Sequence, residues 1–574
     1  MNYSLIIDVY KKIDVTTKRL EITDHLVNLF KRTPKELIDK VVYLTQGKLY
    51  PDYMGIELGV AEKLAIRAIA LAAGTSETNV ERTVKELGDI GEAAAKFMGK
   101  RAQVTLFQEP LTVNRVYEVL DKIAKATGEG AQDLKIKLLS SLLSDASPEE
   151  AKYLVRTVTG RLRLGVADMT ILDALAIAFC GSKDFRPMLE RAYNLSSDLG
   201  SVAKAVAEKG IEGVKTFKIT VGKPIRPMLA ERLTTPEEIL AKIGGKCLAE
   251  YKYDGERLQI HKSPSGVLIF SRRLENITHH YPDVCKLAKE HIKAREAIVE
   301  GECVAINPDT GEMLPFQELM HRRRKYGVEE AMEQYPVALY LFDLLYVDGE
   351  DYTLKPLPER RKKLEEIIEL SDRVQLSKAI EADNVDVLEK FFEQAVEDGC
   401  EGVVAKSIAP DSIYQAGARG WLWIKYKRDY KSEMSDTVDL VVVGAFYGRG
   451  RRAGTYGALL VAAYDPDTDR FKTVCKVGSG FSDEELIELP KKLEPYKLPY
   501  KHPRVDSDMD ADVWFEPALV IEVIGAELTL SPIHTCCKGW VKPGVGISIR
   551  FPRFVRWRLD KSPEDATTTK ELYE

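Results

Sequence analysis

Residues 250–262 read EYKYDGERLQIHK, and the interpretation of the whole chain depends on this stretch. It has the alternation of a strand, so we expect Lys252 and Asp254 on one face, with a carboxylate beside the amine. Gly255 is expected to permit a tight turn directly after them. A lysine acts as a nucleophile only when it is neutral. A lysine in K-x-D-G spacing can equally be an exposed strand-end residue, so this segment alone leaves both interpretations open.

The composition of the chain limits the classes of protein to consider. Its 574 residues are 45 % hydrophobic and 30 % charged, which is typical of a globular protein of roughly three or four domain-sized units. No apolar run reaches the roughly 18 residues of a membrane span, and the first residues have no secretory pattern. Eight cysteines without a CxxC pair favour a reducing, cytosolic setting over a disulfide framework or a four-cysteine zinc site.

The net charge of −6 argues against a uniformly basic nucleic-acid binder. The charge is +2 over residues 1–210, −5 over residues 211–430 and −3 over residues 431–574. A nucleic-acid surface would therefore depend on where the basic side chains lie, which composition does not report.

Three domains are expected from the sequence pattern. Residues 1–215 read as all-α, because leucines recur at helical spacing over 138–143 and Ser147, Pro148 and Glu150 form a capping box with proline at the first helical position. Residues 216–426 mix strand-like runs with helices, which predicts an α+β domain. Residues 427–574 carry glycine-rich turns between short strands, which predicts a small β-barrel. The terminal TTTKELYE is expected to be a loose tail.

An ordered set of motifs indicates what kind of protein these domains form. They run KYDGER from Lys252, SRRLEN from Ser271, VEGE from Val299, LYLFDLLYVDG from Leu339, EGVVAK from Glu401, WLWIKYKRDY from Trp421 and RFPRFVRWR from Arg550. The set resembles the ATP-dependent DNA ligases of the archaeal and eukaryotic replicative type, which are covalent nucleotidyltransferases. The helical third, with QEPLTVNRVYEVL from Gln108 and TGRLRLG from Thr159, resembles their DNA-binding domain. The resemblance implies an all-α DNA-binding domain, an α+β adenylation domain and a C-terminal OB-fold β-barrel.

The resemblance also implies a role for each motif residue. Lys252 would attack the α-phosphorus of ATP and carry AMP, Glu250 would accept from the adenine amino group, and Phe342 would stack on the base. The catalytic group would also contain Asp254, at the reactive end of the site. The residues implied to hold the nucleotide or its phosphates are Arg257, Arg272, Glu302, Arg419, Lys425 and Lys427. Glu302 and Glu401 would bind Mg²⁺, a hard cation that prefers oxygen.

Several of these residues also have a plain structural interpretation. Phe342 can be a core residue, and Glu302 and Glu401 can be strand carboxylates that face solvent. The clusters at 321–325 and 449–452 fit solvated surface charge as well as contacts with the DNA backbone. The run from Arg550 to Arg558 fits a charged edge strand, whereas the resemblance implies a segment that closes over the ATP site through a hinge near Lys427–Lys431.

The implied reaction seals nicks in duplex DNA in replication, repair and recombination. AMP passes from Lys252 to a 5′-phosphate, and a 3′-hydroxyl then displaces it. The helical domain would encircle DNA, with Arg161 and Arg163 near its phosphates. Gln103–Phe107 resembles a short loop that binds a sliding clamp, although a buried inter-helix loop fits as well. We expect a cytoplasmic, nucleoid-associated monomer.

Other functions fit parts of the pattern. An RNA ligase or an mRNA-capping guanylyltransferase would share the covalent lysine, but Glu250 and the helical third favour ATP and duplex DNA. A silent DNA-binding scaffold would not need Lys252, Glu302, Glu401 and Lys425 together. NAD⁺ as donor is disfavoured because no zinc–cysteine module is apparent, and the lack of a GxxxxGK[ST] loop argues against a P-loop ATPase.

Overall fold

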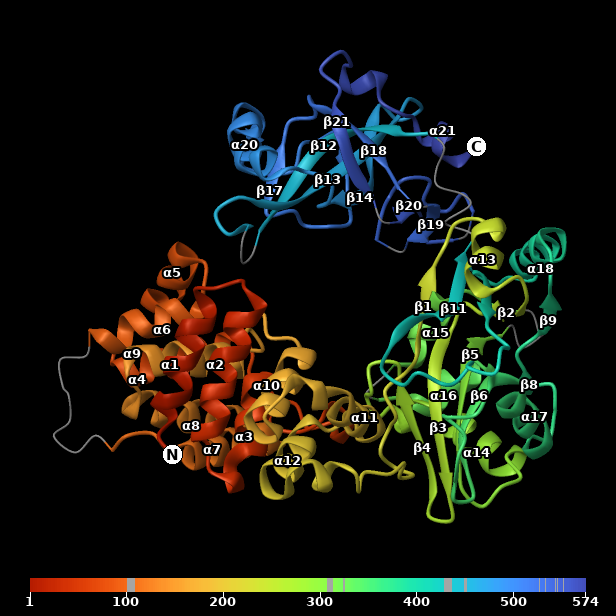
Figure 1. The fold of residues 1–574 in the computed structure, drawn as a ribbon. Helices are drawn as coiled ribbons and strands as arrows, with labels where there is room; N and C mark the ends of the chain where they lie inside the picture. Colours follow the sequence, from red (N-terminus) through yellow and green to blue (C-terminus); the bar gives the residue numbers. More distant parts are fainter. Residues whose placement is uncertain are drawn as a thin grey trace. The chain divides into compact units, whose positions relative to one another are not determined.

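The computed structural model describes residues 1–100, 109–306, 313–323, 326–427, 436–448 and 452–574, apart from single positions 526, 532, 542, 545 and 551 and the side chains of residues 397, 529, 530 and 550. The chain forms two compact units, Met1–Tyr426 and Lys427–Glu574. The first unit contains a helical region (residues 3–214) and a two-sheet region (residues 229–426). Figure 1 shows these parts in chain order, from red helices to blue strands. In the part of the chain that the structure describes, no helix has the length and apolar character to cross a bilayer.

The helical region is held together by one large apolar core. Ser147 accepts from the Glu150 amide, and the Glu150 side chain accepts from the Ser147 amide, so the predicted capping box is confirmed. The helices are α1 (Tyr3–Asp14), α2 (Arg19–Arg32), α3 (Ile38–Thr45), α4 (Glu62–Ala73), α5 (Glu77–Leu87), α6 (Ile90–Gly99), α7 (Val113–Lys125), α8 (Ala131–Asp145), α9 (Pro148–Val158), α10 (Asp168–Cys180), α11 (Arg186–Ser196) and α12 (Leu199–Val214). The expected all-α class of this region is therefore confirmed.

The two-sheet region has two twisted sheets with separate cores. The first sheet has the order β1-β11-β10-β2-β9, and the second has the order β4-β3-β5-β6-β7 with β8 beside β6. The strands are β1 (Leu229–Arg232), β2 (Cys247–Lys252), β3 (Glu256–Ser263), β4 (Gly266–Ser271), β5 (Ala297–Ala305), β6 (Val337–Val347), β7 (Glu350–Asp351), β8 (Val374–Leu376), β9 (Ala379–Ala382), β10 (Gly402–Lys406) and β11 (Arg419–Lys427). This arrangement confirms the expected α+β class.

Helices cover one face of each sheet. The first sheet packs its apolar face on α13 (Pro236–Ile243) and α18 (Val385–Glu397), and the second packs on α14 (Pro282–His291) and α17 (Leu357–Ile367). The short helices α15 (Phe316–Leu319) and α16 (Val328–Gln334) complete the region. Because side chains alternate along a strand, the residues between these buried positions point to the opposite face of each sheet.

The C-terminal unit is rich in strands that form a curled sheet, as expected for the β-barrel. Strand β12 pairs with β13, β17 and β18, and β21 joins through β18. Its elements are β12 (Val438–Tyr447), β13 (Tyr456–Asp465), β14 (Arg470–Val477), α20 (Asp483–Leu493), β15 (Lys497–Leu498), β16 (Val505–Asp506), β17 (Val513–Phe515), β18 (Val520–Ile524), β19 (Glu527–Ser531), β20 (Gly546–Arg550), β21 (Arg553–Trp557) and α21 (Thr569–Tyr573).

The last residues of the chain are packed, so the prediction of a loose tail is wrong. Leu572 of α21 is buried in the barrel core, and the backbone amide of Tyr464 donates to the carbonyl of Thr567. A short polar helix can dock through a single apolar side chain, here Leu572, which the segment's polar composition did not reveal.

Candidate active site

The candidate site starts on the polar face of the first sheet. Glu250 and Lys252 alternate along β2 with the buried residues Ala249 and Tyr251. Strand β10 runs antiparallel beside it, with Val404 opposite Glu250. Side chains of directly opposed residues share a face, so Glu250, Lys252, Val404 and, two residues on, Lys406 point the same way.

The second sheet contributes a matching set of side chains. On β5, Val299 and Cys303 face the apolar core, so Glu300 and Glu302 face the other way. Arg257 of β3 lies directly opposite Glu302. The two sheets meet at Phe342 of β6, whose ring lies 5.3 Å from the Arg257 guanidinium and 4.4 Å from Lys406 Nζ.

Lys252 forms an ion pair with Glu401, which follows α18 in the bend before β10. Both side chains keep about a quarter of their surface exposed, at 26 % and 21 %. Strand β2 ends at Lys252, so Asp254 lies in the bend before β3, where it accepts from the Phe316 amide at 3.1 Å. The expectation that Asp254 shares a strand face with Lys252 is therefore wrong, and Glu401 is the carboxylate paired with the amine.

Gly255 is required for a different reason than the one predicted. Its φ lies outside the left-handed region, but a Cβ atom there would sit 2.2 Å from the carbonyl oxygen of Cys303. The glycine lets the backbone entering β3 pass close to β5. The close approach occurs where the chain passes from Lys252, at the end of β2 in the first sheet, to Arg257 in β3 of the second.

Glu250 is nearly fully buried and is held by two cations. Arg361 of α17 donates to one carboxylate oxygen at 2.6 Å, and Lys406 Nζ lies 2.5 Å from the other. Arg361 is itself fixed because it donates to the backbone carbonyl of Ser377 at 2.6 Å. The charge of Glu250 is thereby balanced inside the protein.

Arg257 is anchored within the second sheet. Its guanidinium makes two hydrogen bonds of 3.1 Å to the carboxylate of Glu300 and one of 2.7 Å to the carbonyl of Met228. Tyr414 also bonds the same carboxylate. The fork-like pairing predicted for Arg257 is thus made with Glu300, which fixes the guanidinium beside Phe342.

The other arginines form a patch of positive potential. Burial, with Arg257 and Arg419 nearby, holds the pKa of Arg272 below its ordinary value. Arg419 is exposed and donates to the carbonyl of Ala230 at 2.9 Å. Among the residues that the structure describes, Arg272 has no hydrogen-bond or ion-pair partner. An anion such as a phosphate would relieve the mutual repulsion of these cations.

In contrast to Arg272, the pKa of the Glu302 carboxyl is raised. Burial raises the pKa of its carboxyl to about 8, and the charges of Glu401 and Glu256 act in the same direction. Lys252 and Arg257 oppose the shift without cancelling it. A cation bound beside Glu302 would favour the charged form of this carboxyl and lower its pKa.

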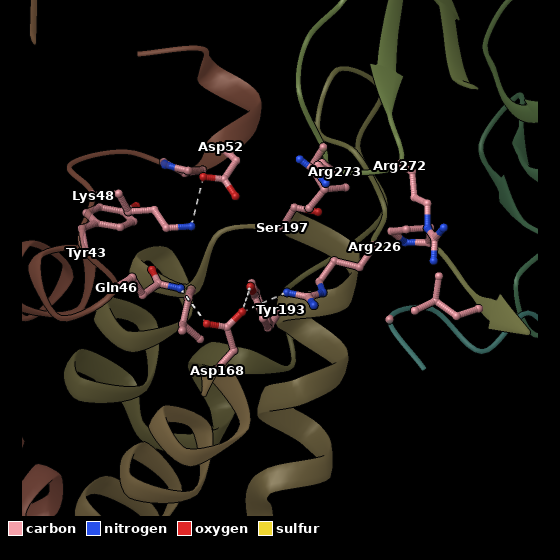
Figure 2. Close-up of a pocket in the computed structure, with 16 residues that line it drawn as sticks. Tyr43, Gln46, Lys48, Asp52, Asp168, Tyr193, Ser197, Arg226, Arg272 and Arg273 are labelled. Atoms are coloured by element: carbon pink, nitrogen blue, oxygen red, sulfur yellow. Dashed lines mark hydrogen bonds and ion pairs between the residues drawn. The ribbon is translucent and has the colours of Figure 1, made fainter. Parts of the chain in front are cut away.

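A cleft of about 670 Å³ opens beside this site, between the helical and two-sheet regions (Figure 2). Arg272 and Arg273 line one side, and Lys48, Arg226, Asp52 and Asp168 are the other charged residues of its lining. Arg226 joins the two regions, because it pairs with Asp168 at 3.3 Å and its backbone amide donates to a carbonyl of α11.

Comparison with known proteins identifies this arrangement. Residues 227–427 match the family model of the ATP dependent DNA ligase domain, residues 2–176 match the DNA ligase N terminus, and residues 452–561 match the ATP dependent DNA ligase C terminal region. A DNA ligase of Staphylothermus marinus is 60 % identical, covering 100 % of this chain and 98 % of the relative. A protein of Thermofilum pendens named DNA ligase 2 is 62 % identical, covering 100 % and 96 %.

The chain belongs to the ATP-dependent DNA ligase family. The family resemblance drawn from the motifs is therefore confirmed. A solved structure titled Pmar-Lig_PreS3 matches with a TM-score of 0.56 at 19 % identity and covers 96 % of this chain and 99 % of that chain, which shows a shared fold.

Most residues that the ligase motifs single out lie on the facing surfaces of the two sheets. Lys425 and Lys427 occupy alternate positions of β11, on the same strand face as the buried Trp423. Phe342 is partly buried against Trp423.

Three residues of the candidate site were not predicted from the sequence: Lys406, Glu300 and Arg361. Lys406 is the last residue of the motif EGVVAK, so the motif itself could have indicated it. Glu300 lies within the quoted VEGE. Arg361 belongs to a helix that reads as an ordinary charged surface helix, and its contact with Glu250 spans 111 positions of sequence.

The basic cluster at 321–325 does not behave as the sequence suggested. Arg322 is completely buried and pairs with Asp283 at 2.6 Å, so neither a solvated face nor a DNA contact describes it. Arg323 pairs with the buried Glu256. Residues 324–325 and 449–451 lie outside the described residues, as does the Gln103–Phe107 loop.

Among the described residues, no group of three His, Cys, Asp or Glu side chains could hold a metal ion alone. Mg²⁺ commonly takes one or two protein carboxylates and fills its remaining positions with water and substrate phosphates. Glu302 and Glu401 fit that pattern, since the charge of Glu401 raises the pKa of Glu302.

Proposed function

We propose that this chain seals nicks with a 5′-phosphate and a 3′-hydroxyl in duplex DNA, through an AMP carried on Lys252. The observation that carries the proposal is the convergence of the ligase motifs from two sheets on Lys252. Two carboxylates lie near this amine, and the same two sheets carry an aromatic ring and a patch of arginines, which are the groups that nucleotidyl transfer from ATP requires.

The first step would form a bond from Lys252 Nζ to the α-phosphorus of ATP and break the α–β phosphoanhydride bond, releasing pyrophosphate. The amine must be neutral and separated from Glu401 before it can attack. Phe342 would stack on the base, while Arg257, Arg272, Arg419 and the lysines of β11 would orient the phosphates.

In the second step, an oxygen of the 5′-phosphate would attack the AMP phosphorus and break the P–N bond to Lys252. In the third, the 3′-hydroxyl oxygen would attack the activated 5′-phosphorus, AMP would leave, and the strand would be joined. Both steps depend on in-line placement and on neutralising charge. Asp254, at the bend beyond Lys252, would act at this reactive end of the site.

Glu302 and Glu401 would hold Mg²⁺ in this scheme. When bound, the ion would neutralise charge on the transferred phosphate. A divalent cation should also be detectable without turnover, as an increase in thermal stability that Glu302→Gln abolishes.

The partners belong to the same proposal. The domains 1–215, 216–426 and 427–574 would act as DNA binder, adenylation domain and mobile barrel, and the Arg550–Arg558 segment would close over ATP. Within the barrel, β21 pairs with β18 and Arg556 pairs with Glu522, which also suits a charged edge strand. We include a sliding clamp bound through Gln103–Phe107 and action as a cytoplasmic, nucleoid-associated monomer.

The direct test is a sealing assay on a nicked duplex that carries one labelled 5′-phosphate. Wild type should join a DNA nick with ATP, and Lys252→Ala should not, whereas Lys390→Ala, an exposed lysine on α18, should act as wild type. Preferential sealing of an RNA nick, or sealing by Lys252→Ala, would contradict the proposal.

A further inference from the structure

Two neighbouring cysteines, Cys536 and Cys537, lie together in the core of the C-terminal unit. Both are free thiols with buried side chains, and their Sγ atoms are 3.6 Å apart. Neighbouring side chains of an extended chain point to opposite sides. Cys537 instead has a φ of 55°, in the left-handed region that residues other than glycine rarely adopt, and both thiols lie on one side of the turn between β19 and β20.

The turn that carries the two thiols is tied to the neighbouring strands. The backbone amide of Cys536 donates to the carbonyl of Thr473 on β14 at 3.0 Å, and the amide of Ile547 on β20 donates to the carbonyl of Cys536 at 2.7 Å. Within the turn, the amide of Trp540 donates to the carbonyl of Cys537 at 3.0 Å. Because the backbone is fixed on both sides, the short distance between the two sulfur atoms is a property of the fold.

The two thiols differ in their surroundings. The Cys537 thiol donates to the backbone carbonyl of Thr569 at 3.1 Å. The hydrogen bond from Cys536 holds the pKa of Cys537 below its ordinary value although burial acts against it, and the same contact together with burial raises the pKa of Cys536. The thiolate is the form of cysteine that attacks an oxidant. Cys537 is therefore the thiol that reacts first, and Cys536 is the thiol that follows.

The end of the chain covers this pair. Thr569 begins α21 and contacts Cys537, Leu572 lies in the same apolar core, and the Tyr573 ring meets the Trp540 ring edge-on at 5.4 Å. In the described part of the chain, the Thr569 hydroxyl is buried without a hydrogen-bond partner, which weakens the attachment of α21. A buried thiol is normally inert, but a short terminal helix opens more easily than a core strand. Opening of α21 thus gives a small solute access to the pair.

We propose that Cys536 and Cys537 are a site of reversible oxidation, at which a hydroperoxide converts the two thiols to a disulfide. The Cys537 sulfur attacks the terminal peroxide oxygen, the O–O bond breaks, and a sulfenic acid and an alcohol form, or water when the oxidant is hydrogen peroxide. The Cys536 sulfur then attacks the Cys537 sulfur, the Sγ–Sγ bond forms, and the sulfenic oxygen leaves as water. The two thiols together lose two electrons and two protons, and the hydroperoxide is reduced.

The product is easily reversed, and it changes the hold on α21. Neighbouring Cα atoms are about 3.8 Å apart, which is closer than in most disulfides, and disulfides outside the usual geometry are more readily reduced. The bond also removes the S–H group that Cys537 donates to Thr569. Oxidation is therefore expected to loosen α21. The inference concerns the C-terminal unit alone and does not depend on the reaction at Lys252.

The first experiment uses the wild-type chain. After treatment with hydrogen peroxide, the protein is denatured, alkylated and digested with trypsin, which places both cysteines and no other on the peptide 505–538. This peptide should lose two hydrogens and resist alkylation until dithiothreitol is added, at a peroxide concentration that leaves the equally buried Cys475 reduced. The proposal is overturned if the peptide stays fully alkylated, gains oxygen without forming the bond, or is joined to another cysteine.

The second experiment assigns the order of attack. Cys536→Ser lacks the second thiol, so a sulfenic acid should accumulate on Cys537 and be trapped by dimedone without any disulfide. Cys537→Ser should form neither product. Faster trapping on Cys536 in Cys537→Ser than on Cys537 in Cys536→Ser would contradict the order. Where a serine variant does not fold, the wild-type peptide still decides whether the site exists.

The third experiment tests access through α21. Leu572→Ala loosens this helix and should speed formation of the disulfide by at least about tenfold, since each 1.4 kcal/mol of easier opening is a factor of ten. Leu493→Ala, buried in the same core on α20, should stay close to wild type. In the wild-type chain, oxidation should also speed tryptic cleavage after Lys570 in α21, and dithiothreitol should reverse the effect. Equal oxidation rates in Leu572→Ala and wild type, or cleavage that ignores oxidation, would refute the role of α21.

Discussion

Replacing Glu302 by glutamine should stabilise the protein at alkaline pH even though it removes a residue of the site. Burial raises the pKa of this carboxyl from 4.5 to about 8. Between these values the unfolded chain has lost the proton and the folded chain still holds it. The folded state therefore binds more protons, and stability falls as pH rises through this window.

The magnitude follows from the same shift. Each pH unit of the window corresponds to about 1.4 kcal/mol, which sets a ceiling of about 5 kcal/mol over the whole window. Because Glu302 is only partly shielded from solvent, we expect about 2 kcal/mol. Glutamine has the shape of the protonated acid and no charge, so the variant should match wild type near pH 5 and exceed it by about that amount near pH 9.

Urea unfolding at pH 5, 7 and 9, without nucleotide or divalent cation, measures this difference. Glu290→Gln, on the exposed side of α14, is the matched control and should show no pH-dependent gap. A gap for Glu302→Gln that stays constant with pH, or one that favours wild type at pH 9, would refute the reasoning. Transfer of AMP to Lys252 should be lost in Glu302→Gln despite its higher stability.

Three further substitutions test the packing around the site and in the barrel. Gly255→Ala brings a Cβ atom to 2.2 Å from a β5 carbonyl and should cost at least about 2 kcal/mol in urea unfolding, while Gly59→Ala, in open space, should cost little; equal stability would contradict the close approach. Arg322→Ala removes a fully buried cation and leaves Asp283 with Arg373 as its ion-pair partner among the described residues, so it should cost about 1–3 kcal/mol; a stable variant whose DNA binding becomes less salt-dependent would instead indicate a DNA contact. Leu572→Ala should lower the unfolding free energy by about 2–4 kcal/mol. An unchanged unfolding free energy would instead indicate that the tail is loose.

The fold and the wall of the site near Lys252 could be predicted because their signals are local. The capping box at Ser147 needs only four consecutive residues, and the alternation of β2 and β5 determines which residues share a face. The motif order then pointed to Glu250, Arg257 and Glu302 without any knowledge of the sheet pairing.

Long-range partners could not be predicted in this way. Arg361 meets Glu250 across 111 positions, and nothing in its helix marks it as different from the neighbouring lysines. Arg322 reads as surface charge because a run of basic residues is usually solvated. In the structure it is fully buried, where it pairs with Asp283 and donates to two backbone carbonyls. The clearance at Gly255 depends on a strand 48 residues away in the sequence.

The central claim is that Lys252 carries AMP. The most direct measurement is peptide mass mapping of the chain after incubation with ATP and Mg²⁺ in the absence of DNA. The account predicts a gain of one AMP on the peptide containing Lys252, removed when nicked duplex DNA is added. An unmodified Lys252 peptide, or AMP on another lysine with Lys252 free, would contradict it.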